Sequence, residues 1–309
     1  MHKTKNRSLA IAFMSLFASV VVRSQTHPID LQGHRGCRGL MPENTIAAMI
    51  KAIDLGVTTI EMDVILTRDK KVILSHDHYM NPDYVLPPAG ESFASAKDKS
   101  HIIYQMDHAS VIRWDVGSKG NSKFPQQEKF PATKPLLSDL IDSVERYTKM
   151  RKLKPVRYNI ETKSSAAGDD KLHPLPEEFV DLLMEIVQKG KISKRTTIQS
   201  FDKRTLQVLH KKYPKISTAY LVNTLPNNSL SGLIHDLGFV PTIISPEYQL
   251  VTTAFLDECR GKGLKVVVWT VNESADIKKM ADMGVDGIIS DYPNKFSILG
   301  VQLNNTPKH

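Results

Sequence analysis

Short apolar or β-branched runs alternate with amphipathic segments along most of the chain after residue 28. The runs predict eight strands, at 29–33, 58–66, 156–162, 196–200, 216–222, 242–245, 265–271 and 286–290. Between them, apolar residues recur at helical spacing, as Ile46, Ile50 and Ile53 do in the first such segment. These segments predict helices at 43–54, 138–149, 177–189, 202–212, 229–237, 252–262 and 274–283.

Strands that alternate with helices predict a parallel sheet, most simply closed into a (β/α)₈ TIM barrel. A doubly wound open sheet is the alternative, but no GxGxxG phosphate loop follows the first strand. Residues 71–76 predict one added strand, in a hairpin with the second barrel strand. Polar residues at predicted helix starts are candidate caps, namely Asn44 or Thr45, Ser138, Asp202 and Ser274.

Residues 77–135 interrupt this alternation, because they show no sustained period and contain NPDY, LPPAG and FPATKP. An irregular segment of this length inside a compact domain is uncommon and is usually functional. We therefore expect an insertion over the barrel mouth, after the second barrel strand. Its Tyr79, Trp114 and Phe124 could cover a substrate or pack the insertion onto the barrel.

The first 24 residues have the layout of a secretory signal peptide: basic MHKTKNRS, apolar LAIAFMSLFASVVV and small polar RS. The apolar run is too short to span a bilayer comfortably, although an uncleaved anchor is the alternative. We expect a periplasmic or secreted mature protein, residues 25–309, that forms a single catalytic domain with no stable membrane insertion. Cleavage would lower the net charge from +8 to +4, because the leader holds four basic residues and no acid.

This mild and scattered positive charge argues against a nucleic-acid partner. Oligomeric state leaves no signal in the sequence. An exported protein could join its two cysteines, Cys37 and Cys259, but one lies in a loop and the other in a predicted outer helix. A disulfide is therefore not expected.

Chemically useful side chains collect at the carboxyl ends of the predicted strands, where barrel active sites form. The residues at or near these ends are His34, Arg35, Glu61, Asp63, His76, Glu161, Lys163, Gln199 and Trp269. The other histidines that we place in loops or helices are expected at the surface, namely His101, His108, His173, His210 and His235.

Glu61 and Asp63 are two residues apart on one strand, so both point to the same side. Paired carboxylates inside a barrel repel each other and are costly to bury. A cation removes that cost, and Glu161 on the next strand offers a third oxygen ligand. Oxygen-only sites suit Mg²⁺ or Ca²⁺. A structural ion network with Arg35 or Lys163 is the alternative.

His34 and His76 can take or give a proton near neutral pH, and a pair could act on opposite sides of a phosphate. Arg35 and Lys163 are suited to hold that phosphate. Trp269 could offer a ring face to a substrate or simply pack the top of the barrel. The loop GHRGCRGLMPENT, residues 33–45, carries several of these groups, and its Gly and Pro residues predict a rigid loop that approaches a ligand closely.

GHRG followed by PENT, then EMD, HD, ETK, WTVN and GVDGIISDYP, resembles the glycerophosphodiester phosphodiesterases from about residue 29 to 296. The resemblance implies a TIM barrel that hydrolyses glycerophosphodiesters to an alcohol and glycerol 3-phosphate with one divalent cation. It implies His34 and His76 as the acid–base pair, Glu61, Asp63 and Glu161 as metal ligands, and Arg35 and Lys163 as phosphate contacts. Glu43 and Gln199 would contact these groups and hold them in position. NPDYVLPPAGES, after HD, departs from the family pattern and leaves the preferred alcohol open.

Two other functions stay open at this point. One is a lysophospholipase D-like or intramolecular transferase activity on lipids, which needs an apolar mouth that the polar insertion does not suggest. The other is a non-catalytic barrel that binds phospho-sugars, which the presence of both His34 and His76 disfavours.

Overall fold

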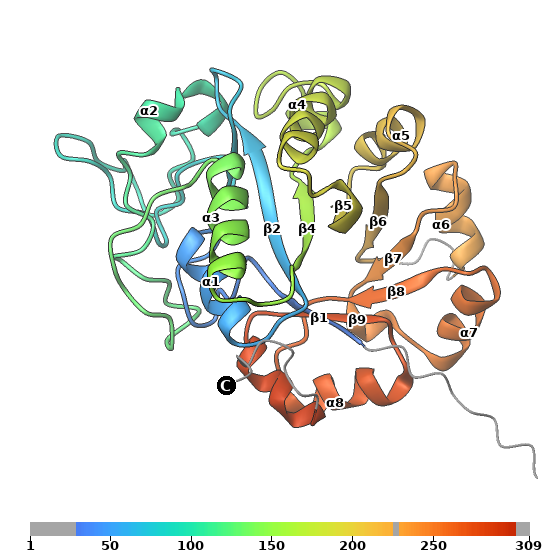
Figure 1. The fold of residues 1–309 in the computed structure, drawn as a ribbon. Helices are drawn as coiled ribbons and strands as arrows, with labels where there is room; N and C mark the ends of the chain where they lie inside the picture. Colours follow the sequence, from blue (N-terminus) through green and yellow to red (C-terminus); the bar gives the residue numbers. More distant parts are fainter. Residues whose placement is uncertain (1–28, 225–228, 301–309) are drawn as a thin grey trace, which may run out of the picture.

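Eight parallel strands close into a barrel in the part of the chain that this computed structural model describes, residues 29–224 and 229–300. They follow the order β1-β9-β8-β7-β6-β5-β4-β2, and pairing of β1 with β2 closes the ring (Figure 1). The strands are β1 (Asp30–Gly33), β2 (Thr59–Leu66), β4 (Arg157–Thr162), β5 (Thr196–Ser200), β6 (Ser217–Val222), β7 (Ile243–Pro246), β8 (Lys265–Val268) and β9 (Gly287–Ser290). The predicted (β/α)₈ barrel is therefore confirmed, and the open sheet is wrong because β1 and β2 leave no free edge.

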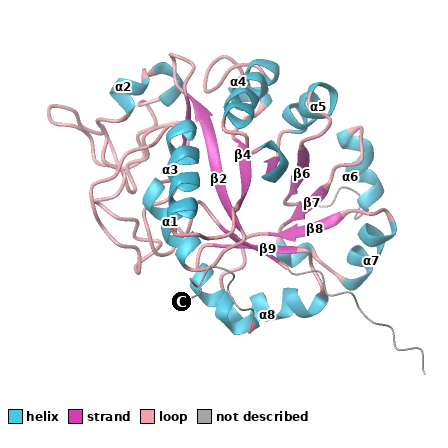
Figure 2. Ribbon diagram, viewed as in Figure 1, coloured by secondary structure: helices cyan, strands magenta, loops and turns pink. Residues whose placement is uncertain are grey.

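Helices form the outer layer around these strands (Figure 2). They are α1 (Ile46–Asp54), α3 (Leu137–Met150), α4 (Pro176–Lys189), α5 (Lys203–Lys212), α6 (Leu230–Leu237), α7 (Thr253–Gly261) and α8 (Ser274–Met283). Each matches a helix predicted from the apolar periodicity, to within a few residues at its ends.

Two of the predicted caps are correct and two are wrong. The Thr45 and Asp202 side chains accept hydrogen bonds from Ala48 N and Arg204 N, each at 3.1 Å. Ser138 and Ser274 instead lie within the first turns of α3 and α8. The chain just before α3 pairs with the added strand, where Leu74 N donates to Pro135 O at 3.0 Å.

The interior of the barrel is divided between polar and apolar side chains. Ala219, Ile243, Val267 and Ile289, from β6 to β9, form an apolar cluster separate from the main core between strands and helices. On the opposite side, Asn159 of β4 donates to Gln32 of β1 at 2.8 Å. β2 separates these two strands in the sheet, so this hydrogen bond crosses the barrel interior.

The segment 77–135 lies beside the barrel, next to β2, α1 and α3 (Figure 1). The added strand β3 (Val72–Leu74) runs antiparallel to the end of β2, as predicted. The segment itself holds only η1 (Ile103–Gln105) and α2 (His108–Val111), and it packs a small core of its own against Ile65 and Ile73. Trp114 is 1% exposed in that core, so it packs the segment rather than covering a ligand.

Several smaller expectations are also decided. His173 was expected at the surface, which is wrong. It is fully buried because the loop after β4 folds over it, with Ser165 N donating to its Nε2 at 3.0 Å. Cys37 and Cys259 are both buried and unpaired, as expected. The predicted signal peptide lies outside the described residues, and among the described helices none has the length and apolarity needed to cross a bilayer.

Candidate active site

Three buried carboxylates meet at the carboxyl end of β2 and β4. Glu61 and Asp63 share the inner face of β2, and Glu161 is the register partner of Asp63 on β4. One oxygen from each of the three lies within 4.8 Å of the others. The structure thus brings together the two carboxylates that the period-two pattern placed on one face and the third that was expected from the next strand.

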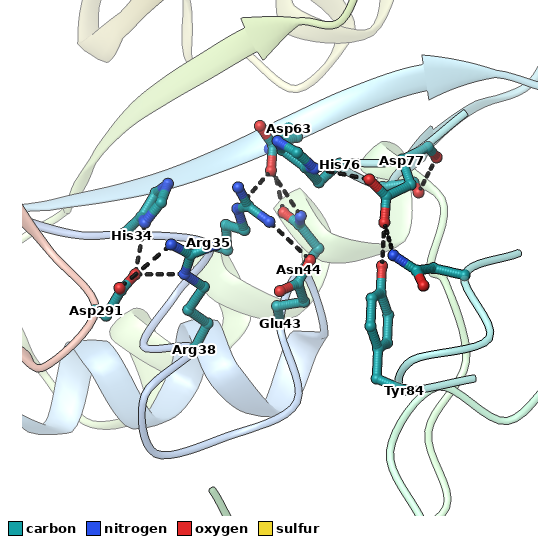
Figure 3. Close-up of polar contacts among 12 residues, drawn as sticks. His34, Arg35, Arg38, Glu43, Asn44, Asp63, His76, Asp77, Tyr84 and Asp291 are labelled. Carbon is teal, nitrogen blue, oxygen red and sulfur yellow. Dashed lines mark hydrogen bonds and ion pairs between the residues drawn. The ribbon is translucent and has the colours of Figure 1, made fainter. Parts of the chain in front are cut away.

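Two cations pair with this cluster. Arg35 lies 3.1 Å from Asp63 Oδ2 through Nε and 2.9 Å from Glu43 Oε1 through Nη1 (Figure 3). Lys163 Nζ lies 2.7 Å from Glu161 Oε1. Burial opposes ionisation of Asp63, but Arg35 and Lys163 hold the pKa of this carboxyl well below its usual range. The ion network considered as an alternative therefore exists.

Among the described residues, that network leaves the Glu61 side chain without an Arg or Lys side chain as its ion-pair partner. Burial, reinforced by the Asp63 carboxylate, raises the pKa of Glu61 well above its usual range. Asp63 Oδ1 is buried without a hydrogen-bond partner. Lys163 Nζ lies 3.8 Å from Asp63 Oδ1, beyond hydrogen-bond distance. Arg35 and Lys163 form ion pairs with the other three buried carboxyl groups, Glu43, Asp63 and Glu161. The buried Lys134 also acts electrostatically on Glu43 and Asp63. An oxygen-only cluster with a buried carboxylate oxygen that accepts no hydrogen bond fits a hard divalent cation.

Glu61 is held at both of its oxygens. Arg35 N donates to Oε2 at 2.7 Å, and Gln199 Nε2 donates to Oε1 at 2.8 Å. Asn44, which the sequence suggested as a helix cap, instead donates to Asp63 Oδ2 at 2.9 Å (Figure 3). Asn44 has φ +55°, a left-handed conformation that asparagine tolerates better than most residues, and this turns its amide toward β2.

His34 follows β1 and contacts a carboxylate that sequence reasoning missed. Its Nδ1 lies 2.6 Å from Asp291 Oδ1, and Arg38 Nε donates to the same oxygen at 2.6 Å. Burial, with a contribution from Arg38, lowers the pKa of His34 to about 4, so the ring is neutral near pH 7. Nδ1–H therefore donates to Asp291, and Nε2 keeps its lone pair on the side of Glu61. Asp291 directly follows β9, so the strand-end rule could have found it.

His76 reaches the site by a different route from His34. His76 follows β3, and β2 lies between β3 and the strand β1 that leads to His34. β3 runs antiparallel, and Ser75 N donates to Asp63 O at 3.0 Å, which brings the chain back to the carboxylates. His76 Nδ1 then lies 3.0 Å from Asp77 Oδ1.

Asp77 is anchored in turn by two residues of the segment 77–135. Its Oδ2 accepts from Asn81 Nδ2 at 2.6 Å and from the Tyr84 hydroxyl at 3.1 Å (Figure 3). Although burial opposes it, hydrogen bonding from His76 and Asn81 keeps the pKa of Asp77 well below its usual range. Both histidines thus have Nδ1 tied to an ionised carboxylate, which leaves Nε2 of each free for proton transfer.

A cavity of about 160 Å³ lies over these groups. Its polar wall includes His34, Arg35, Arg38, Glu61, His76, Glu161, Lys163 and Gln199, and its apolar wall includes Phe201, Leu221, Trp269 and Ile289. Trp269 packs edge-on against Phe201 and donates from Nε1 to Ser245 O at 2.7 Å, so it is both barrel packing and cavity wall. No described residue of 78–135 lines this cavity.

A larger hollow of about 650 Å³ lies on the outer surface between α7, α8 and the short helix η6 (Pro293–Leu299). It is lined by residues such as Lys278, Asp282 and Ile298 and contains none of the side chains described above. We therefore place the chemistry in the smaller cavity at the barrel mouth.

Comparison with known proteins agrees with this location. Residues 34–295 match the glycerophosphoryl diester phosphodiesterase family. Glycerophosphodiester phosphodiesterase of Bacillus subtilis (strain 168) is 27% identical over 271 residues, which cover 85% of this chain and 83% of that protein. A crystal structure from Silicibacter pomeroyi DSS-3, assigned to the glycerophosphoryl diester phosphodiesterases, is 30% identical with a TM-score of 0.77 and covers 88% of this chain and 94% of that one. An Oleispira antarctica phosphodiesterase, solved with its product sn-glycerol-3-phosphate, shares the fold at 22% identity and a TM-score of 0.69, covering 88% of this chain and 97% of that one.

Proposed function

This chain belongs to the glycerophosphoryl diester phosphodiesterase family, and we propose that it hydrolyses glycerophosphodiesters to an alcohol and sn-glycerol 3-phosphate with the help of one divalent cation. The observation that carries this proposal is the meeting of three buried carboxylates with two histidines whose Nδ1 atoms are both tied to carboxylates. A barrel that only binds phospho-sugars has no need for such a pair.

Glu61, Asp63 and Glu161 would hold the cation, Ca²⁺ or Mg²⁺, because they offer carboxylate oxygens in one buried cluster. When bound, the cation would neutralise charge on the phosphate oxygens and draw electron density from phosphorus. Gln199 and Arg35 N keep Glu61 in place, and Asn44 does the same for Asp63. Glu43 keeps the Arg35 side chain beside this cluster.

The phosphate would lie against the polar wall of the cavity, where Arg35 and Lys163 contribute positive charge. Both cations already pair with carboxylates, so their positions are set before a substrate arrives. The Trp269 and Phe201 side chains would contact the carbon-bearing part of the diester, because they form the apolar wall.

His34 is suited to remove a proton and His76 to supply one. Neutral His34 accepts a proton at Nε2 from the attacking hydroxyl, while Asp291 stabilises the ring that becomes charged. A new P–O bond forms as the bond to the leaving alcohol breaks, and His76 Nε2–H protonates the alcohol oxygen. The attacking hydroxyl can belong to water or to the neighbouring glycerol hydroxyl, in which case a cyclic phosphate precedes hydrolysis.

We also propose that the enzyme works outside the cytoplasm, as a periplasmic or secreted protein. This rests on the signal-peptide layout of residues 1–24 alone.

Choline release from glycerophosphocholine by the purified chain 25–309 tests the proposal. We expect turnover with Mg²⁺ or Ca²⁺, loss of turnover in excess EDTA, and recovery when either cation is added back. Lysophosphatidylcholine serves as the comparison substrate for the lipid alternative. Turnover that persists in EDTA would refute the cation, and turnover of the lysolipid alone would favour the lysophospholipase D-like alternative.

A further inference from the structure

A line of buried amide side chains runs through the polar half of the barrel interior and ends on Glu61. Gln199 Nε2 donates to Glu61 Oε1 at 2.8 Å, and Asn159 Nδ2 donates to Gln199 Oε1 at 2.9 Å. Asn159 Nδ2 also donates to Gln32 Oε1 at 2.8 Å, and Gln32 Nε2 donates to Asp30 Oδ2 at 2.9 Å. We call Asp30, Gln32, Asn159, Gln199 and Glu61 the amide line.

The chemistry at its two ends determines the direction of every hydrogen bond in the amide line. With the proposed cation bound, Glu61 is an ionised carboxylate and only accepts hydrogen bonds. Gln199 and Gln32 accordingly turn their NH₂ groups toward Glu61 and Asp30. Both glutamines then present carbonyl oxygens to Asn159. Only an NH₂ group, with two donors, can satisfy both carbonyls at that point. Asn159 Oδ1 is accordingly buried without a hydrogen-bond partner.

Filling space does not require these amides. The other half of the interior is filled by Ala219, Ile243, Val267 and Ile289, which is the usual way to pack a barrel. Asn159 and Gln199 are each 2% exposed, and a buried amide is costly unless its hydrogen bonds are made. The amide line therefore needs a role that apolar side chains could not fill.

We infer that Asn159 is a positioning residue for the proposed cation site, and that it acts through Gln199. By accepting no hydrogen bond and donating two, Asn159 keeps the Gln199 carbonyl turned away from Glu61. The Gln199 NH₂ group then holds Glu61 Oε1, while Arg35 N holds Oε2. Glu61 is thus fixed before a cation binds. This inference rests on the proposed cation site, and it assigns a role to a residue that touches neither cation nor substrate.

Cation affinity is the readout, measured by calorimetric titration of Mg²⁺ and of Ca²⁺ into the metal-free chain 25–309. Asn159→Leu removes both donors at nearly constant size, and Gln199→Met removes the group that holds Glu61. We expect each to weaken cation binding by about 10–100-fold, the usual cost of losing a residue that supports a metal ligand. Because Asn159 acts through Gln199, the double variant should bind within about twofold of Gln199→Met alone.

Gln32→Met is the matched control, since it removes a buried amide and one Asn159 hydrogen bond but leaves the Asn159–Gln199–Glu61 part intact. It should bind the cation within about twofold of wild type. Three outcomes would each overturn the inference. They are a cation affinity of Asn159→Leu equal to that of wild type, losses of affinity that multiply in the double variant, and a loss of affinity in Gln32→Met as large as that in Asn159→Leu. Should Asn159→Leu not fold, Asn159→Ser takes its place under the same criteria. Absence of cation binding by the wild-type chain would overturn the proposed cation site itself, and the inference with it.

Discussion

Asp291 sets which ring nitrogen of His34 carries the proton, so Asp291→Asn tests the proposed base. His34 Nδ1 and Arg38 Nε each lie 2.6 Å from Asp291 Oδ1, and Asn272 Nδ2 donates to Oδ2 at 2.8 Å. Every other partner of this carboxylate donates. Two donors, Asn272 Nδ2 and Arg38 Nη2, contact Oδ2, whereas Oδ1 has only one, Arg38 Nε. The NH₂ group of an asparagine would therefore take the place of Oδ1, where Arg38 Nε loses its acceptor and His34 accepts at a deprotonated Nδ1. The ring proton would move to Nε2, and the lone pair used for catalysis would be lost.

The expected loss is that of general base catalysis, about 10²–10⁴-fold in kcat. KM should change little, because His34 acts on the proton and not on the bound phosphate. Replacing a charged acceptor also weakens folding, by about 1.5–3 kcal/mol for a hydrogen bond to a charged group. A protein of this size should tolerate that loss and remain folded at 25 °C.

The assay is steady-state hydrolysis of glycerophosphocholine, together with ¹⁵N chemical shifts of the His34 ring, which distinguish the two tautomers. Asn272→Ala is the control, because it removes the hydrogen bond to Asp291 Oδ2, and those that Asp291 N and Ser290 Oγ donate to Asn272 Oδ1, but keeps that between Oδ1 and His34. We expect at most a modest change in kcat for this control. Either of two results would show the reasoning to be wrong. One is an Asp291→Asn enzyme whose kcat is within tenfold of wild type. The other is an enzyme whose kcat falls while the His34 ring proton stays on Nδ1.

Four further outcomes are expected. Mg²⁺ or Ca²⁺ should raise the melting temperature of EDTA-treated protein, since a cation bound only by the folded state adds about 2.7 kcal/mol at 100 times its Kd; an unchanged melting temperature in calorimetry would argue against the site. His76→Ala should lower kcat on glycerophosphocholine by about 10²–10⁴-fold, but less on a substrate with a p-nitrophenol leaving group, which needs no acid; equal losses would remove His76 from that role. Tyr84→Phe removes a hydrogen bond to the ionised Asp77, worth about 1.5–3 kcal/mol, and loss of about 1 kcal/mol of this from the transition state should lower kcat roughly fivefold. The order of preference among choline, ethanolamine and glycerol diesters should stay the same, because no described residue of 78–135 lines the cavity. Amino-terminal sequencing of exported protein should find a start near Gln25, and retention of Met1 would favour an anchor.

Local pattern was enough to predict the barrel and its carboxylate cluster. The spacing of apolar residues identified the strands and helices, because its period of two in strands and of about 3.6 in helices repeats within a few residues. The same period of two placed Glu61 and Asp63 on one face of β2, and the rule that strand ends meet brought Glu161 to them. For the segment 77–135, the sequence left covering a substrate and packing onto the barrel as alternatives, and the structure shows packing for Trp114. The segment's lack of a period was correct, but periodicity says nothing about where an irregular segment packs.

Tertiary structure decided how the reactive groups are held. Asp291 lies 257 positions from His34, and they meet only because β9 pairs with β1 as the barrel closes. Closure also turns Asn159 toward Gln32, which is 127 positions away and not on a neighbouring strand. The sequence by itself thus determined which residue types point inward at each strand, because side-chain direction is a local property of the backbone. Which of them touch, and which nitrogen of each histidine is left free, depends on contacts across the closed barrel that no local period encodes.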